Sequence, residues 1–164
     1  GMMRSAYRAK NFRNALDAAE ALKAADGCTP ALAREADYIK AKSLMVSSQR
    51  SAAMDIFRQL AKTPSTDEGA EAAYLVIQDA YDQGRFNVIE DKVYAFSAKA
   101  GSQSYWLAKA FIVLGDSFAE QDNMAQAKAT FESVRDGYKP AAGDSDDVTE
   151  GVKMRLEKLN ELMK

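Results

Sequence analysis

The sequence lacks histidine altogether and contains a single cysteine among its 164 residues. Without histidine there is no histidine acid–base catalysis, no Ser–His or Cys–His nucleophile pair, and most kinds of zinc site are ruled out. The lone Cys28 excludes an internal disulfide. The chain also has no phosphate-binding lysine loop, no dinucleotide glycine fingerprint and no G-x-S-x-G motif. We therefore predict no catalytic residues, no cofactor and no metal ion.

Strong charge and long apolar runs are also missing. The net charge of −2 argues against a nucleic-acid partner, because such binding requires a basic stripe that displaces counterions. No run of 18 apolar residues is present, which predicts that no segment spans a membrane. No signal peptide is visible after Gly1. The chain starts with what reads as half of a helical hairpin, so we expect a fragment of a longer protein. A cytoplasmic and a bacterial periplasmic location both remain open.

What the sequence does contain is a repeat. An aromatic or leucine residue recurs every 37 positions, at Tyr7, Leu44, Tyr81 and Phe118. A second apolar segment follows each of these residues, and the segments match one another at an offset of 74. Within each segment the apolar residues are spaced by three and four, which is one face of an α-helix. No window alternates with a period of two. The pattern predicts an all-α protein built from helical hairpins.

The expected helices can be placed by their end signals. Thr29 and Pro30 are a capping hydroxyl followed by proline at the first helical position. Ser65 and Glu68 have the spacing of a capping box. Glycine after a helix favours a left-handed C-terminal cap, which we expect at two glycines separated by 74 positions, Gly27 and Gly101. The predicted helices span 2–9, 12–25, 31–47, 51–62, 67–83, 86–99, 104–121, 124–136 and 146–163.

The last predicted helix has no hairpin partner. Its apolar residues form one stripe of Val148, Val152, Leu156, Leu159 and Met163. We interpret it as a capping helix over the apolar end of a stack; a docking helix for another subunit is the alternative. Trp106, beside Tyr105 at another helix start, is expected to serve as a hydrophobic staple or as an anchor for a partner.

One hairpin carries a recognisable family pattern. It consists of Phe111, Leu114, Gly115, Phe118, Ala127, Phe131 and Pro140. This hairpin resembles the tetratricopeptide repeat family, whose pattern is W-x2-L-G-x2-Y, A-x3-F and P. The resemblance implies a right-handed α–α superhelix forming one domain over 1–164. Its parts would be a partial first hairpin at 1–26, hairpins at 31–62, 67–99 and 104–137, and the capping helix at 146–163.

The resemblance also implies a binding face. In this family the first helix of each hairpin lines a concave groove that holds a peptide or a partner helix. The positions that correspond to this lining are Tyr38, Lys42, Met45, Leu75, Asp79, Asp82, Ile112 and Asp116. Acidic residues gather at one end of this set, so a partner with a basic segment is expected. The implied function is a scaffold or protein–protein interaction module that is not an enzyme.

Other interpretations remain beside this one. Asp79 with Asp82, and Asp116 with Glu120, have one-face helical spacing that suits acid catalysis or a hard cation, although solvated surface charge is the simpler interpretation. The chain is alternatively a bacterial cell-envelope assembly factor or a docking segment of a larger enzyme. Self-association through the N-terminal end, near Tyr7, is a further alternative.

Overall fold

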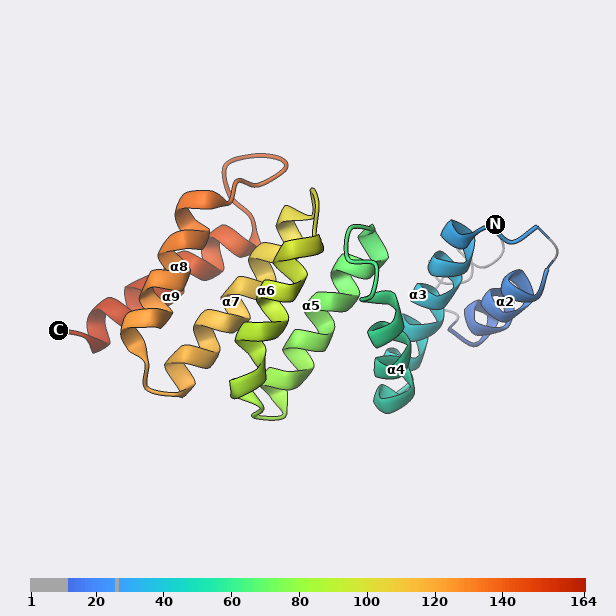
Figure 1. Ribbon diagram of the computed structural model, residues 1–164, viewed down its shortest axis with the longest axis horizontal. Helices are drawn as coiled ribbons and strands as arrows, with labels where there is room; N and C mark the ends of the chain where they lie inside the picture. Colours follow the sequence, from blue (N-terminus) through green and yellow to red (C-terminus); the bar gives the residue numbers. More distant parts are fainter. Residues whose placement is uncertain (1–11, 26) are drawn as a thin grey trace. The chain divides into compact units, whose positions relative to one another are not determined.

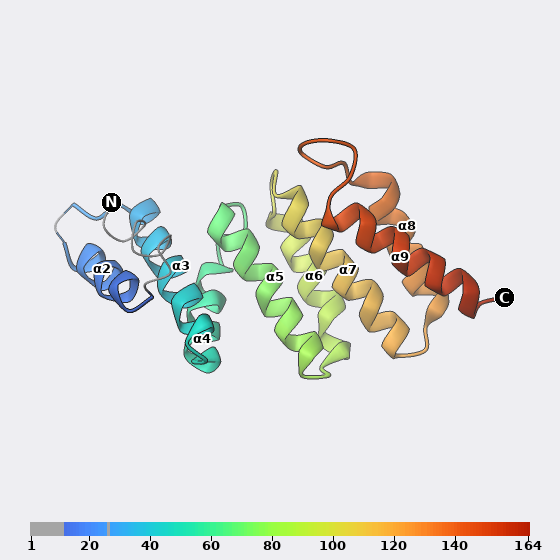
Figure 2. The same ribbon diagram turned by 180° about the vertical axis from the view of Figure 1, so that it is seen from behind.

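A computed structural model describes residues 12–25 and 27–164, and this part of the chain contains helices and no strand (Figures 1 and 2). The prediction of an all-α protein is confirmed. The elements are α2 (Phe12–Ala24), α3 (Pro30–Val46), α4 (Arg50–Leu60), α5 (Asp67–Asp82), η1 (Phe86–Val88), α6 (Ile89–Lys99), α7 (Ser104–Glu120), α8 (Met124–Gly137) and α9 (Asp147–Leu162).

Most observed helices end within two residues of the predicted positions. The segment 86–99 differs, because its first turn, η1, is a 3-10 helix and the α-helix begins only at Ile89. The predicted capping box of Ser65 and Glu68 is wrong. Thr66 is the N-cap of α5, and its hydroxyl accepts a hydrogen bond from the Gly69 amide at 3.0 Å. The predicted helix at 2–9, with Tyr7, lies outside the described residues.

Several other helix ends are fixed by a side-chain cap or by a glycine. Caps satisfy backbone amides that have no partner within the helix. Thr29 caps α3, as the sequence predicts, and Asp146 caps α9 in a reciprocal box with Thr149. Gly101 follows the end of α6 with a φ of +58°, and Gly27 has a φ of +81°. Because L side chains rarely adopt this conformation, glycine is favoured at both positions. Gly101 directly follows the C-cap residue of α6, as the prediction of a left-handed cap requires, whereas α2 already ends at Ala24, three residues before Gly27.

The chain divides into two compact units, residues 1–63 and 64–164. In the first unit, α3 packs against both α2 and α4. The buried cluster between α2 and α3 consists mostly of alanines, with Ile39 as its largest member. Between α3 and α4 larger side chains such as Phe57 and Leu60 are buried. The α2–α3 contact therefore buries little apolar surface per residue.

The second unit contains α5 to α9. Each hairpin packs its two helices together, α5 on α6 and α7 on α8, and α7 also packs against α5 and α6 of the preceding hairpin. Helix α9 lies against α8 and α7 (Figures 1 and 2). The successive first helices α5, α7 and α9 are thus neighbours, since α7 contacts both of the others.

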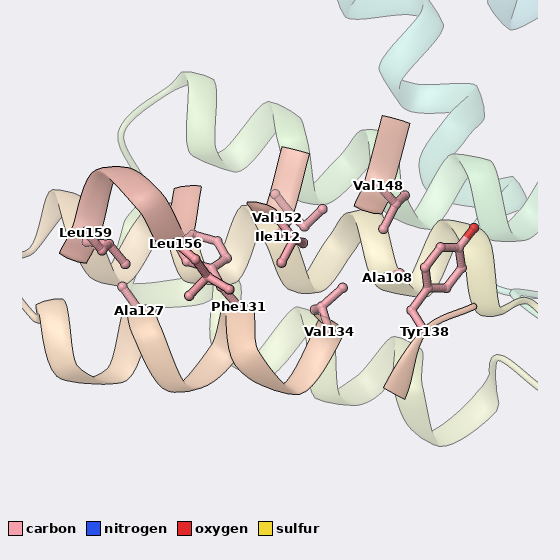
Figure 3. Close-up of a cluster of buried hydrophobic side chains, with 10 residues drawn as sticks. All are labelled: Ala108, Ile112, Ala127, Phe131, Val134, Tyr138, Val148, Val152, Leu156 and Leu159. Carbon is pink, nitrogen blue, oxygen red and sulfur yellow. The ribbon is translucent and has the colours of Figure 1, made fainter. Parts of the chain in front are cut away.

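A core cluster of this unit joins α7, α8 and α9 (Figure 3). Four α9 side chains from the predicted stripe are buried in it, namely Val148, Val152, Leu156 and Leu159. Met163, the fifth residue of that stripe, follows the end of α9 and is 48% exposed. Gly115 allows close packing of α7 on α8, because a Cβ at this position would lie 2.4 Å from the Phe131 ring. A residue without a Cβ at position 115 therefore has a steric reason.

Candidate interaction surface

A small recess lies where α5, α7 and α9 meet. It encloses about 160 Å³ and is lined by Tyr74, Gln78, Lys109, Ile112, Val113, Asp116, Asp147, Val148 and Arg155. We call it the α5–α7–α9 recess. The lining combines two basic side chains, two carboxylates and several apolar ones. Such a lining suits contact with the side chains of a polypeptide, and it offers a volume below that of ordinary small-molecule pockets.

An ion pair across α7 and α9 forms one edge of this recess. The guanidinium of Arg155 donates two hydrogen bonds to the Asp116 carboxylate, at 2.7 and 3.0 Å. A third bond runs from Arg155 to the carbonyl oxygen of Gly151, at 3.1 Å. The hydrogen bond from Arg155 to Asp116 raises the pKa of the guanidinium, against the opposing effect of burial. The negative charge of Asp116 is therefore balanced by Arg155 within the protein.

The Lys109 ammonium, also part of the recess lining, lies among three aromatic rings. The Nζ atom lies 5.0 Å from the ring centre of Tyr74, 5.5 Å from that of Tyr105 and 5.4 Å from that of Trp106. Asp147 at the start of α9 lies 3.4 Å from the same Nζ and accepts hydrogen bonds from the Tyr105 hydroxyl. These cation–π and charge contacts connect α5, α7 and the first turn of α9.

A larger groove opens beyond the Arg155–Asp116 pair. It encloses about 600 Å³ and is lined by Tyr81, Asp116, Ala119, Glu120, Asp122, Met124, Phe131, Met154, Arg155, Lys158, Leu159 and Leu162. We call it the α7–α9 groove. We call the apolar lining residues Ala119, Met124, Phe131 and Leu159 its apolar floor. The end of α7 and the turn after it contribute Glu120 and Asp122 on one wall, and α9 contributes Lys158 on the other.

Two of the predicted binding residues lie in these hollows. Ile112 lines the α5–α7–α9 recess, and Asp116 lines both the recess and the groove. On α5, Asp82 is exposed and accepts a hydrogen bond from the Gln78 amide nitrogen at 2.8 Å. Leu75 is partly buried on the same helix and is outside both linings.

The structure places Asp79 in a different environment from the solvated carboxylate that the sequence suggests. Its side chain is 2% exposed, accepts a hydrogen bond from Gln83 at 3.0 Å and lies 3.7 Å from the Arg85 guanidinium. It therefore belongs to the packing at the end of α5, where a buried carboxylate requires such partners. Asp79 also lies outside both linings.

The three remaining predicted residues belong to α3 in the first unit. Lys42 places its ammonium 5.6 Å from the ring centre of Tyr38, one turn away on the same helix. The sulfur of Met45 lies 3.9 Å from a guanidinium nitrogen of Arg50. All three side chains are partly buried. These contacts are local to α3 and the start of α4.

Sequence reasoning misses several residues of this surface. Tyr74 and Gln78 line the recess, although neither belongs to the predicted groove residues. The pattern does not single out Arg155, because its partner Asp116 lies 39 positions away on another helix. It does not single out Lys109 either, because the rings around this side chain come from two helices. Trp106 lies within α7 and packs against Tyr74 of α5, with ring centres 5.7 Å apart.

The described residues contain no group of three or more cysteine, aspartate and glutamate side chains able to hold a metal ion. In the same part of the chain, no helix combines the length and the apolar character that crossing a membrane requires. Comparison with protein-family models, with curated proteins and with solved structures found no match to this chain.

Proposed function

We propose that this protein is a non-catalytic interaction module, a scaffold that holds a peptide or helix of a protein partner on the α5, α7 and α9 side of its second unit. The observation that carries the proposal is the α7–α9 groove. Its volume of about 600 Å³, its apolar floor and its charged walls suit the side chains of a polypeptide.

The packing order of the second unit supports a solenoid of the tetratricopeptide type. In that architecture each first helix contacts its own hairpin partner and the first helix of the next hairpin. Helix α7 makes both kinds of contact, with α8 and with α5 and α9. The glycine at position 115, where a Cβ would meet the Phe131 ring, occupies the family's small-residue slot. We propose a right-handed superhelix on this basis, with α9 as its capping helix.

The charged residues of this surface indicate which kind of partner it can accept. Of the acidic residues proposed from the sequence, Asp79 is buried and Asp116 is paired with Arg155. Glu120 and Asp122 are the exposed acids of the groove wall. A partner with basic residues beside an apolar stripe would place its charge near this pair of carboxylates.

A displayed peptide library tests the proposal. The library would be selected on the wild-type protein and counter-selected on the double variant Met154→Glu/Leu162→Glu. Both side chains are exposed, at 68% and 62%, so this variant should fold while losing the apolar character of the groove. We expect enriched peptides with apolar residues at helical spacing, which the double variant fails to bind.

The matched control is Val46→Glu, which changes another exposed apolar side chain, on α3 and outside the groove. This variant should bind the selected peptides like the wild type. If no peptide distinguishes the double variant from this control, the assignment of function to the groove is wrong. Circular dichroism of all three proteins checks that helix content is unchanged.

A further inference from the structure

Helix α9 carries a second apolar face besides the one that enters the core. Five large hydrophobic side chains are strongly exposed among the described residues, and three of these belong to α9 or to the turn after it, namely Met154, Leu162 and Met163. Met154, Lys158 and Leu162 are spaced by four, so they follow one face of the helix. All three line the α7–α9 groove, and none belongs to the core cluster.

The charges of the groove do not neutralise one another within the described part of the chain. Lys158 is exposed and makes no ion pair with any residue that the structure describes, and the same is true of the Asp122 carboxylate. Glu120 accepts one hydrogen bond, from the Tyr81 hydroxyl at 3.3 Å. A basic side chain and two acidic ones thus border the same apolar floor from different sides.

The α9 face and the α7–α9 groove are complementary in chemistry. The face offers two apolar side chains with a lysine between them, and the groove offers an apolar floor with an acidic wall. A surface that contains both halves of a complementary pair can form a two-fold symmetric contact, in which each copy supplies each half once. Each Lys158 would then meet Glu120 and Asp122 of the other copy.

We propose that the occupant of the α7–α9 groove is the α9 face of a second copy of this chain, so that the protein forms a symmetric dimer through α9. The proposal rests on the proposed function and names the partner of the same surface. The contact involves one helix and one groove per copy, so the dimer should be reversible and concentration-dependent, as small interfaces are. Its ion pairs are solvent-exposed, so added salt should weaken it.

Charge-reversal variants can distinguish a second copy of this chain from any other occupant of the groove. Lys158→Glu alone, and Glu120→Lys with Asp122→Lys, each place like charges on both sides of the symmetric contact. Each variant should weaken dimerisation by about tenfold or more. In an equimolar mixture, the glutamate introduced in the first variant faces the two lysines introduced in the second, while the unchanged Lys158 of the second faces the unchanged Glu120 and Asp122 of the first. Both halves of the contact are complementary, and the mixture should form mixed dimers.

Sedimentation velocity from about 1 μM to about 1 mM, the range of weak to moderate association, measures dimerisation of each protein. Native mass spectrometry of the mixture identifies mixed dimers, and their formation shows that both variants are folded. Lys153→Glu is the matched control, because it reverses an exposed lysine of α9 that is outside the groove lining. This control should dimerise like the wild type.

A wild-type protein that stays monomeric over the whole range overturns the proposal. So does a dimer that is insensitive to both charge reversals, which would point to another surface such as the N-terminal end, and so does a mixture that forms no mixed dimers. These results are distinct from failure of the proposed function. A monomeric protein that still binds library peptides in the groove refutes the second copy as occupant and leaves the interaction module intact.

Discussion

Arg155 of α9 holds Asp116 of α7 through two hydrogen bonds across 39 positions of sequence. The pair is only partly shielded, with the Arg155 and Asp116 side chains 38% and 25% exposed. It separates the α5–α7–α9 recess from the α7–α9 groove, because both residues line both hollows. The position of α9, and therefore the shape of the candidate binding surface, depends on this contact as well as on the apolar core.

Breaking this ion pair should loosen α9. Arg155→Met keeps the apolar stem of the side chain, and Asp116→Asn keeps its shape, so each removes mainly charge. We expect each to lower the free energy of unfolding by about 1 kcal/mol, the scale of a partly exposed bidentate pair. The measurement is chemical denaturation followed by the fluorescence of Trp106, the only tryptophan of the chain. The double variant should lose less free energy of unfolding than the two single variants lose together. Strictly additive losses would contradict a direct coupling between the two side chains.

The close approach of α7 and α8 at Gly115 predicts a steric penalty. A Cβ there would lie 2.4 to 2.8 Å from three carbons of the Phe131 ring, which is buried in the core. Gly115→Ala should therefore destabilise the protein by about 1–3 kcal/mol, although alanine is the better helix former. Gly137→Ala is the matched control, because its new Cβ would meet no packed neighbour within 4 Å. It should be neutral or stabilising, and equal losses in both variants would rule out the steric explanation.

The Tyr105 hydroxyl predicts a loss of stability in alkali. Burial, and then the hydrogen bond to Asp147, raise the pKa of Tyr105 to about 12, against about 10 in an unfolded chain. Between these values the folded state binds more protons than the unfolded state, so stability falls as pH rises. This stabilising contribution is fully present below about pH 10 and is lost as pH passes about 12.

Denaturation curves at pH values from about 9 to about 12 would measure this decline. In Tyr105→Phe the decline should be smaller, because the group that titrates is gone. Part of it should remain, since burial and the hydrogen bond to Asp146 also raise the pKa of Tyr138. Tyr94→Phe, which removes the hydroxyl of an exposed tyrosine elsewhere in the unit, is the comparison variant measured under the same conditions. An unchanged slope in Tyr105→Phe would refute the assignment.

The alanine-rich contact of α2 with α3 predicts that α2 is the less stable element. The buried residues there are four alanines and Ile39, whereas α8 buries Phe131 and Val134 among larger neighbours, and Tyr138 directly after it is also buried. Because the hydrophobic contribution scales with buried apolar area, α2 should open more readily than α8. Hydrogen exchange measured by mass spectrometry should show faster exchange for Phe12–Ala24 than for Met124–Gly137. Equal protection of the two helices would contradict this order.

The helices and most of their ends could be predicted from local chemistry. Apolar spacing of three and four defines a helix face from a short stretch of chain, and Thr29 with Pro30 marks a helix start without reference to other residues. The α9 stripe predicted its buried side, with Val148, Val152, Leu156 and Leu159 in the core. The cap of α5 could not be predicted in this way, since Ser65 and Thr66 both carry a suitable hydroxyl and backbone geometry selects Thr66.

The environment of each polar side chain was decided by tertiary packing. Periodicity gives the direction of a side chain on its own helix, but it contains no information on how neighbouring helices are rotated or how far they approach. Asp79 and Asp116 occupy equivalent positions of the repeat, yet Asp79 is buried beside Gln83 while Asp116 pairs with Arg155. The rings around the Lys109 ammonium likewise come from two helices, α5 and α7. Local sequence therefore accounts for the helices, and contacts between helices account for the surface they build, because charge pairing depends on distances that only the folded chain defines.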